Sequence, residues 1–163
     1  MWQVADGVIV APQKIGRGGI FFLPQRPYFV RGTLYGQMRY PSRPDAAPEE
    51  RASDICGMRA ALETVGLGHL ASWDAVVDWT TVLSPGQLQL LSVARALWHA
   101  PRFLVMDEAT SALDLAGEAR VYDAVVAADL AVLSVAHRET LIRYHSACLL
   151  LDGTGSWELR ARE

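Results

Sequence analysis

One block of this chain, residues 83–114, constrains the fold more than any other stretch. It reads LSPGQLQLLSVARALWHAPRFLVMDEATSALD. Turn-forming residues at 84–86 precede a helical pattern at 87–98, and a continuous apolar run follows at 103–106. Such an apolar run is typical of a parallel strand that is buried on both faces. The block therefore predicts a turn, a helix and a buried strand in close succession.

The rest of the chain repeats this alternation of strand and helix. The spacing of apolar residues predicts strands over 8–11, 19–23 and 131–135, and helices over 49–65 and 117–128. A short helix over 67–73, a mobile proline-containing surface loop over 39–50 and a closing hairpin of strands 149–151 and 157–159 complete the pattern. This order predicts an α/β fold with a mostly parallel sheet.

Composition sets wide bounds on function. At 163 residues, 51% of them hydrophobic, the chain is one domain by size. No run approaches the roughly 20 apolar residues that a membrane-spanning helix needs, and the first residues lack the pattern of a signal peptide. A net charge of −3 gives no reason to expect nucleic acid as a partner. Cys56 and Cys148 are expected to be free thiols.

Two carboxylates, Asp107 and Glu108, directly follow the predicted buried strand. In open α/β sheets, ligands bind beyond the carboxyl ends of the strands. Carboxylate oxygens are the ligands that a hard divalent cation prefers. Taken alone, the pair is therefore either part of a cation site or a solvated acidic strand end.

The sequence lacks the glycine-rich loop with which many proteins bind the phosphates of a nucleotide beside such a cation site. That loop has the pattern G-x-x-x-x-G-K-[ST], whose glycines let backbone N–H groups approach the phosphates and whose lysine reaches the β and γ phosphates. The one lysine, Lys14, is followed by Ile15 and Gly16, and the glycine cluster at 16–19 carries Arg17 and no lysine. We therefore expect the chain alone to lack most contacts to a triphosphate.

The block at 83–114 resembles the signature motif, the Walker B strand and the D-loop of the ATP-binding cassette (ABC) ATPases. Residues 83–87, LSPGQ, are similar to the LSGGQ signature, with Pro85 in place of the first glycine. The resemblance implies that three residues contact the γ-phosphate of a nucleotide held on the other subunit: Ser84, Gly86 and Gln87. Ser84 also has a simpler interpretation as a helix N-cap, and the two roles are compatible.

The same resemblance assigns roles to residues that follow the predicted strands. It implies that Asp107 is a ligand of Mg²⁺ and that Glu108 is the catalytic base that polarises the attacking water. Gln25, in Pro-Gln-Arg-Pro, resembles the Q-loop glutamine, which touches Mg²⁺ and water. His137, 29 residues after Glu108, resembles the switch histidine that contacts the γ-phosphate. ATP and Mg²⁺ are the cofactors that these roles imply.

Several stretches are similar to subfamily D of the ABC transporters. They are the signature proline at 85, FLPQRPY at 22–28 and DGTGSWEL at 152–159. Members are half-transporters of peroxisomal and lysosomal membranes that handle acyl-CoA esters or cobalamin. The resemblance implies ATP hydrolysis coupled to transport at the cytosolic face of such a membrane. It implies two partners, a transmembrane domain and a second nucleotide-binding domain in a head-to-tail dimer.

The implied architecture is a truncated P-loop NTPase (ABC ATPase) domain, that is, an α/β domain with a mostly parallel sheet and a helical subdomain. Core strands and the Q-loop would occupy residues 1–34, the helical subdomain 35–86 and the remaining core 87–163. We expect the isolated chain to be poorly soluble and neither to bind ATP tightly nor to hydrolyse it. Two alternatives remain open: a non-catalytic partner that supplies the signature motif to a full-length ABC ATPase, and a soluble ABC protein of repair or translation.

Overall fold

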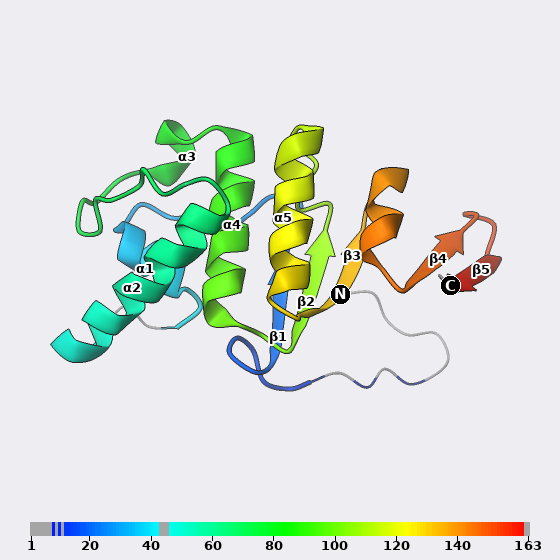
Figure 1. Ribbon diagram of the computed structural model, residues 1–163, viewed down its shortest axis with the longest axis horizontal. Helices are drawn as coiled ribbons and strands as arrows, with labels where there is room; N and C mark the ends of the chain where they lie inside the picture. Colours follow the sequence, from blue (N-terminus) through cyan, green and yellow to red (C-terminus); the bar gives the residue numbers. More distant parts are fainter. Residues whose placement is uncertain (1–7, 9, 11, 43–45, 162–163) are drawn as a thin grey trace.

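The computed structural model describes residues 8, 10, 12–42 and 46–161. In chain order the elements are β1 (Ile20–Leu23), α1 (Leu34–Arg39), α2 (Pro48–Thr64), α3 (Trp79–Val82), α4 (Pro85–His99), β2 (Phe103–Asp107), α5 (Leu115–Ala127), β3 (Ala131–Val135), the 3-10 helix η1 (Glu139–Tyr144), β4 (Ala147–Leu151) and β5 (Trp157–Ala161). Figure 1 shows α1, α2 and α3 at one end of the molecule, α4 and α5 beside the sheet in the middle, and the β4–β5 hairpin at the other end.

The central sheet has three parallel strands in the order β1-β2-β3. The register of β2 pairs Phe103 with both Ile20 and Ala131, and Asp107 with Val135. The strands β4 and β5 form a separate antiparallel pair. These pairings confirm the predicted α/β class, and they place the carboxyl ends of β1, β2 and β3 at one edge of the sheet.

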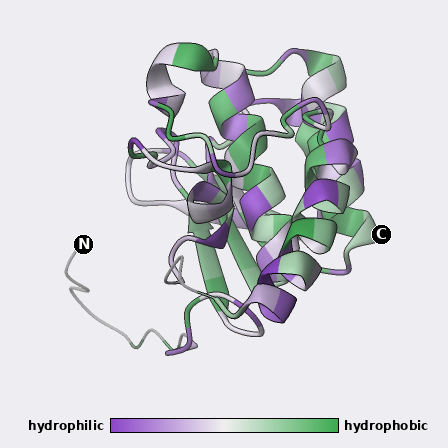
Figure 2. Ribbon diagram, turned by 90° about the vertical axis from the view of Figure 1, so that its left-hand side faces the viewer, coloured by the Kyte–Doolittle hydropathy of each residue, from purple (hydrophilic) through white to green (hydrophobic). Residues whose placement is uncertain are grey.

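The two faces of this sheet differ sharply in exposure. Phe21 and Leu104, on one face, are 6% and 0% exposed and belong to the hydrophobic core that includes residues of α4 and α5. Phe22 and Leu133, on the other face, are 54% and 64% exposed. Figure 2 colours the strands predominantly as hydrophobic, and the exposed Phe22, Leu133 and Val135 make the second face apolar as well. In the described part of the chain, helices thus cover one face of the sheet only.

The strand register defines two sets of residues. The covered face consists of Phe21, Leu23, Leu104, Met106, Val132 and Ser134. The open face consists of Ile20, Phe22, Phe103, Val105, Asp107, Ala131, Leu133 and Val135. Parallel sheets are normally buried on both faces, whereas among the described residues only the covered face packs against helices.

One predicted helix is absent. Residues 67–73 form turns instead of the expected helix. Gly66 follows α2 with a φ of +86°, and the N–H of Leu67 donates to the carbonyl of Leu62. Such a left-handed glycine ends a helix and redirects the chain, and Gly68 two residues later adds a second position of low helix propensity.

Three short helices were missed because they are too short to show an apolar period. Thr33 caps α1 by accepting a hydrogen bond from the N–H of Gly36, and Asp78 caps α3 by accepting from Thr80. The 3-10 helix η1 follows β3. Each runs over only four to six residues. The caps of α1 and α3 are visible in the sequence, but a cap alone does not define a helix.

Two expected irregular or extended segments also differ from the prediction. In the proposed loop over 39–50, Arg39 ends α1 and Pro48 begins α2, while residues 43–45 lie outside the described residues. In the proposed strand over 8–11, residues 9 and 11 lie outside the described residues, and Val8 and Val10 are in no strand. Because residues 39–50 combine prolines with charged residues, their sequence predicted a loop, although the segment includes the end of α1 and the start of α2.

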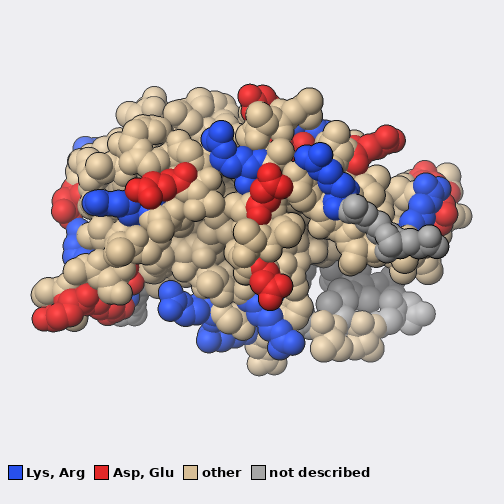
Figure 3. All heavy atoms as spheres, in the orientation of Figure 1, with Lys and Arg blue, Asp and Glu red and all other residues tan. Residues whose placement is uncertain are grey.

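The surface carries mixed charge. On the face shown in Figure 3, acidic and basic side chains are interspersed. Within the described ranges, no helix is both long and apolar enough to cross a membrane. Cys56 and Cys148 are free thiols, as predicted.

Candidate functional site

Glu108 lies at the centre of a group of polar side chains at the carboxyl edge of the sheet. The Nε2 amide of Gln25 donates to Glu108 Oε2 at 2.6 Å, and Nε2 of His137 lies 3.0 Å from Glu108 Oε1. These residues come shortly after β1, β2 and β3 respectively. The parallel strands therefore bring together three residues that are separated by 83 and 29 positions in the chain.

The backbone of Glu108 is held in an unusual conformation. Its φ is +46°, in the left-handed region that few residues other than glycine adopt. Its N–H donates to the carbonyl of Val135 at 2.9 Å, which extends the pairing of β2 with β3 by one residue. Such strain costs about 1–3 kcal/mol and clusters at functional sites, and here it directs a carboxylate away from the strand.

Asp107 is the last residue of β2 and lies on the open face, opposite Val135. It is half-buried. Among the described residues, no group of three or more His, Cys, Asp or Glu side chains is arranged as a metal site. The side-chain oxygens of Asp107 and Gln25 suit a hard cation such as Mg²⁺, which usually completes its shell with phosphate oxygens and water.

The predicted signature turn forms the capped start of α4. Ser84 Oγ accepts a hydrogen bond from the N–H of Gln87, and Gln87 Oε1 accepts one from the N–H of Ser84. This is a capping box, with Pro85 in the first turn of the helix, so the N-cap interpretation of Ser84 is confirmed. At Gly86 an added Cβ would lie 3.1 Å from the carbonyl oxygen of Ala112. Gly86 thus allows α4 and the segment after β2 to approach closely.

The segment 109–114 after Glu108 is held by an ion pair between the buried Glu118 and the partly exposed Arg138. Thr110 Oγ1 donates to Glu118 Oε1 at 2.9 Å, and Arg138 Nη1 lies 3.3 Å from Glu118 Oε2. Arg138 also donates to the carbonyl of Leu113 at 3.1 Å. Asp114 caps α5 by accepting from the N–H of Gly117. Arg138 follows His137 directly, so the two segments after β2 and β3 are fixed to each other.

The sequence-predicted residues fall into two groups. Gln25, Glu108 and His137 are brought together, with Asp107 adjacent to them in the chain. The second group, at the start of α4, comprises Ser84, Gly86 and Gln87. Within the described part of the chain, no hydrogen bond joins the second group to Glu108 or to its two partners. The catalytic, nucleotide and metal roles of these seven residues stay predictions.

Sequence reasoning missed three residues that shape the site: Gln89, Glu118 and Arg138. Gln89 and Glu118 are each 3% exposed. Both are polar residues on the buried side of an amphipathic helix, and this placement is a signal that the sequence contained. Arg138 was visible only as a neighbour of His137.

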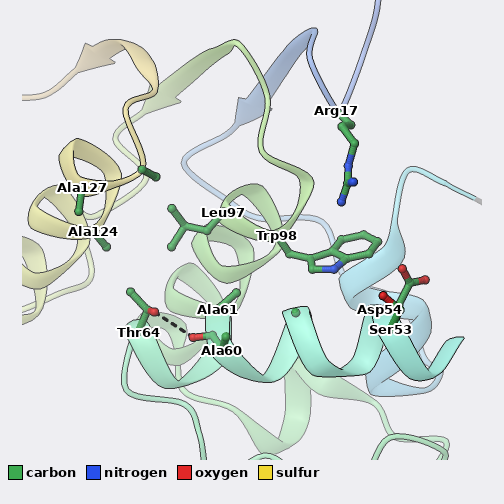
Figure 4. A pocket seen from close by; sticks show the side chains of 12 residues that line it. Arg17, Ser53, Asp54, Ala60, Ala61, Thr64, Leu97, Trp98, Ala124 and Ala127 are labelled. Carbon is green, nitrogen blue, oxygen red and sulfur yellow. Dashed lines mark hydrogen bonds between the residues drawn. The ribbon is translucent and has the colours of Figure 1, made fainter. Parts of the chain in front are cut away.

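A large cavity of the described residues does not coincide with the candidate site. A cavity of about 340 Å³ is lined by Gln25, Arg26, Pro27, Pro85, Leu88, Gln89, Ser111 and Ala112, close to Glu108. A cavity of about 590 Å³ lies between α2, α4 and α5, beside Leu97 and Trp98 (Figure 4). Five of its twelve lining residues are alanine, and Arg17 lies at its rim. None of the predicted site residues lines it, so chemistry and not size identifies the candidate site.

Known proteins and one protein family match the sequence of this chain. Residues 8–111 match the family model described as ABC transporter. The chain is 34% identical over 164 residues to ATP-binding cassette sub-family D member 3 of Homo sapiens, covering 98% of this chain and 24% of that protein. It is 38% identical over 165 residues to the Lysosomal cobalamin transporter ABCD4 of Homo sapiens, covering 98% and 27%. It thus spans about a quarter of the length of these relatives.

A solved structure supports the same assignment. A bacterial Atm1-family ABC exporter with ATP bound is 26% identical, with a TM-score of 0.66, and the match covers 82% of this chain and 23% of that one. Since the family model matches well over half of its length, the chain belongs to the ABC transporter family. Its resemblance to subfamily D is shown by the relatives it matches.

Proposed function

We propose that this chain is a partial nucleotide-binding domain of an ATP-driven membrane transporter of subfamily D. The observation that carries the proposal is the contact of Glu108 with both Gln25 and His137 at the carboxyl edge of the parallel sheet. A carboxylate between an amide and an imidazole is suited to orient a water molecule and accept its proton. We assign Glu108 as the catalytic base and His137 as its partner toward the γ-phosphate.

Mg²⁺ and ATP are the proposed cofactors. Asp107 and the Oε1 atom of Gln25 would hold the metal, since both offer oxygen to a hard cation. Bound Mg²⁺ would neutralise the phosphate charge during phosphoryl transfer. In this arrangement Glu108 needs no metal bond, because its two carboxylate oxygens already engage Gln25 and His137.

The position of Asp107 on the open face indicates where the nucleotide phosphates would lie. The residues near Asp107 on that face are apolar, and Leu133 and Val135 are 64% and 51% exposed. A phosphate-binding strand and helix carried by a further segment of polypeptide would cover this apolar surface and bring the phosphates next to Asp107. We propose that this segment and a transmembrane domain complete the functional unit.

The finer assignments follow the named relatives. One is a lysosomal cobalamin transporter and others are sub-family D members 1 and 3. The name of the first of these relatives supports cobalamin and a lysosomal membrane, and the resemblance to subfamily D implies acyl-CoA esters and a peroxisomal membrane as the second possibility. In both cases we propose that the chain acts at the cytosolic face. Residues 1–34, 35–86 and 87–163 are proposed as core strands with the Q-loop, helical subdomain and remaining core.

The alternative function is that of a non-catalytic partner. Ser84 and Pro85 are exposed at the start of α4, away from Glu108. The exposed start of a helix offers N–H groups to an anion on another molecule. In a head-to-tail dimer, Ser84, Gly86 and Gln87 would then complete a nucleotide site whose phosphate-binding loop belongs to the second nucleotide-binding domain.

The test is ATP binding and hydrolysis with and without a phosphate-binding loop. The chain alone is expected to bind Mg-ATP more weakly than a dissociation constant of about 1 μM, which corresponds to about −8 kcal/mol. A fusion that adds the phosphate-binding segment of a subfamily D relative before residue 1 is expected to hydrolyse ATP. In that fusion, Glu108→Gln should lower the rate by about 10²–10⁴-fold while ATP still binds.

The matched control is Glu63→Gln in the same fusion, because Glu63 is an exposed carboxylate of α2. It should leave hydrolysis unchanged. Full activity in the Glu108→Gln fusion would show that Glu108 is not the base. If the fusion is inactive but the unfused chain raises the ATPase rate of a full-length relative, and Ser84→Ala abolishes that rise, the partner function is the correct one.

A further inference from the structure

Gln89 of α4 is a buried glutamine that contacts two loops, the one after β1 and the one after β2. Its Oε1 atom accepts a hydrogen bond from the N–H of Ala112 at 2.9 Å, and its Nε2 atom lies 3.2 Å from Ser111 Oγ. The same Nε2 atom lies 3.4 Å from the carbonyl oxygen of Gln25 and 3.5 Å from that of Glu108. Both ends of one amide are therefore used, with the two shorter contacts as the stronger ones.

Burying the side-chain amide of Gln89 costs free energy unless the two loops keep their hydrogen bonds to it. Gln89 is only 3% exposed, and its neighbours in α4, Leu91 and Val93, are fully buried apolar residues. A buried amide that loses its partners costs about 1–3 kcal/mol. The hydrogen-bonded arrangement of the loops is thus linked to the packing of α4, because moving Ser111 or Ala112 away leaves Gln89 unsatisfied.

The loops that Gln89 joins line a cavity. The segment 25–27 and residues 111–112 are on the walls of the cavity of about 340 Å³, and Gln89 is on its wall as well. A cavity between two loops means that side-chain packing does not fix their spacing there. The amide of Gln89 supplies that connection.

We propose that Gln89 is a positioning residue, which sets the segment 109–113 and the Gln25 loop in place relative to Glu108. Through the Gln25 carbonyl it fixes the loop whose side-chain amide donates to the Glu108 carboxylate at 2.6 Å. Through Ala112 and Ser111 it fixes the segment that approaches Gly86 at the start of α4. The consequence for ATP hydrolysis rests on the proposed function, but the placement of the loops does not.

The test compares two equally buried glutamines by nuclear magnetic resonance of the full chain. Gln89→Met keeps the volume and removes both hydrogen-bonding ends. The Ala112 amide should then exchange its hydrogen about tenfold faster, the factor that corresponds to losing about 1.4 kcal/mol, and the side-chain amide resonances of Gln25 should shift. Gln37→Met is the matched control, since Gln37 is 4% exposed and bonds to Val30 instead. It should lower the melting temperature without changing either readout.

A second variant separates the two ends of the amide. Gln89→Glu retains an oxygen that can accept from the Ala112 N–H but has no N–H for Ser111 or Gln25. Slow exchange at Ala112 should persist while the Gln25 resonances shift. Unchanged Ala112 exchange and Gln25 resonances in the Gln89 variants, or equal changes in Gln37→Met, would overturn the proposal. Neither readout needs nucleotide, so a failure of the Mg-ATP test leaves this one intact.

Discussion

The covered and open faces of the central sheet have similar apolar composition but opposite surroundings. Leu104 and Met106 on the covered face are 0% and 1% exposed, whereas Phe22 and Leu133 on the open face are 54% and 64% exposed. The covered face explains how the chain holds Glu108 in place. The open face, which also carries Asp107, is not covered by any helix of the described residues. One sheet thus has a packed face and an exposed apolar face.

The largest expected difference in stability is between alanine substitutions at two neighbouring residues of β2, one on each face of the sheet. Leu104→Ala removes a fully buried side chain from the covered face and should lower the free energy of unfolding by about 2–5 kcal/mol. Val105 is half-buried and lies on the open face. Val105→Ala should therefore lower the free energy of unfolding clearly less, because water already reaches that side chain. Urea denaturation followed by circular dichroism measures both. Equal losses would mean that the open face is packed in solution, for instance against another copy of the chain.

The next prediction is that the free energy of unfolding depends on pH because of a buried histidine that packs near the covered face. His99 ends α4, is 4% exposed and lies with its ring 5.2 Å from that of Phe21. Burial lowers the pKa of His99, although a hydrogen bond to the Tyr40 carbonyl acts in the opposite direction. As the pH falls below about 6.5, the unfolded chain therefore binds a proton at this residue before the folded chain does. The free energy of unfolding should decrease in that range.

The measurement is the pH dependence of unfolding between pH 7 and pH 5 for the original chain and for His99→Gln. The variant has no group that titrates at this position, so its stability should fall less steeply. His69→Gln replaces an exposed histidine in the same way and should keep the original slope. If His99→Gln has the original slope and His69→Gln the shallow one, the burial of His99 does not control the acid response.

The sequence predicted the elements that lie near the sheet and missed those that depend on distant contacts. The strand at 103–106 and the helix at 87–98 were found because apolar period and helix caps are local properties. The turns at 67–73 replaced a predicted helix because left-handed Gly66 ends α2 there. Elements of four to six residues, such as α1 and α3, have too few positions for a period to be recognised.

The same limit applies to the candidate site. Gln25, Glu108 and His137 were predicted by resemblance, and their meeting in space follows from parallel strands whose ends share one edge. The contacts of Gln89 with residues 25, 108, 111 and 112 were not predictable from spacing, because they join α4 to loops that are up to 64 positions away. An apolar helix with one buried amide was the available signal, but the partners of the amide appear only in three dimensions.

The smallest expected change in stability tests the open face directly, with two neighbours in β3. Leu133→Ser replaces a side chain that is 64% exposed, and the free energy of unfolding should change by no more than about 0.5 kcal/mol. The same substitution at Val132, which is partly buried and packed against the core, should destabilise the chain measurably. Aggregation, followed by light scattering, should decrease in Leu133→Ser because an exposed apolar patch becomes more polar. A large loss of stability in Leu133→Ser with unchanged scattering would mean that the open face is covered in the isolated chain.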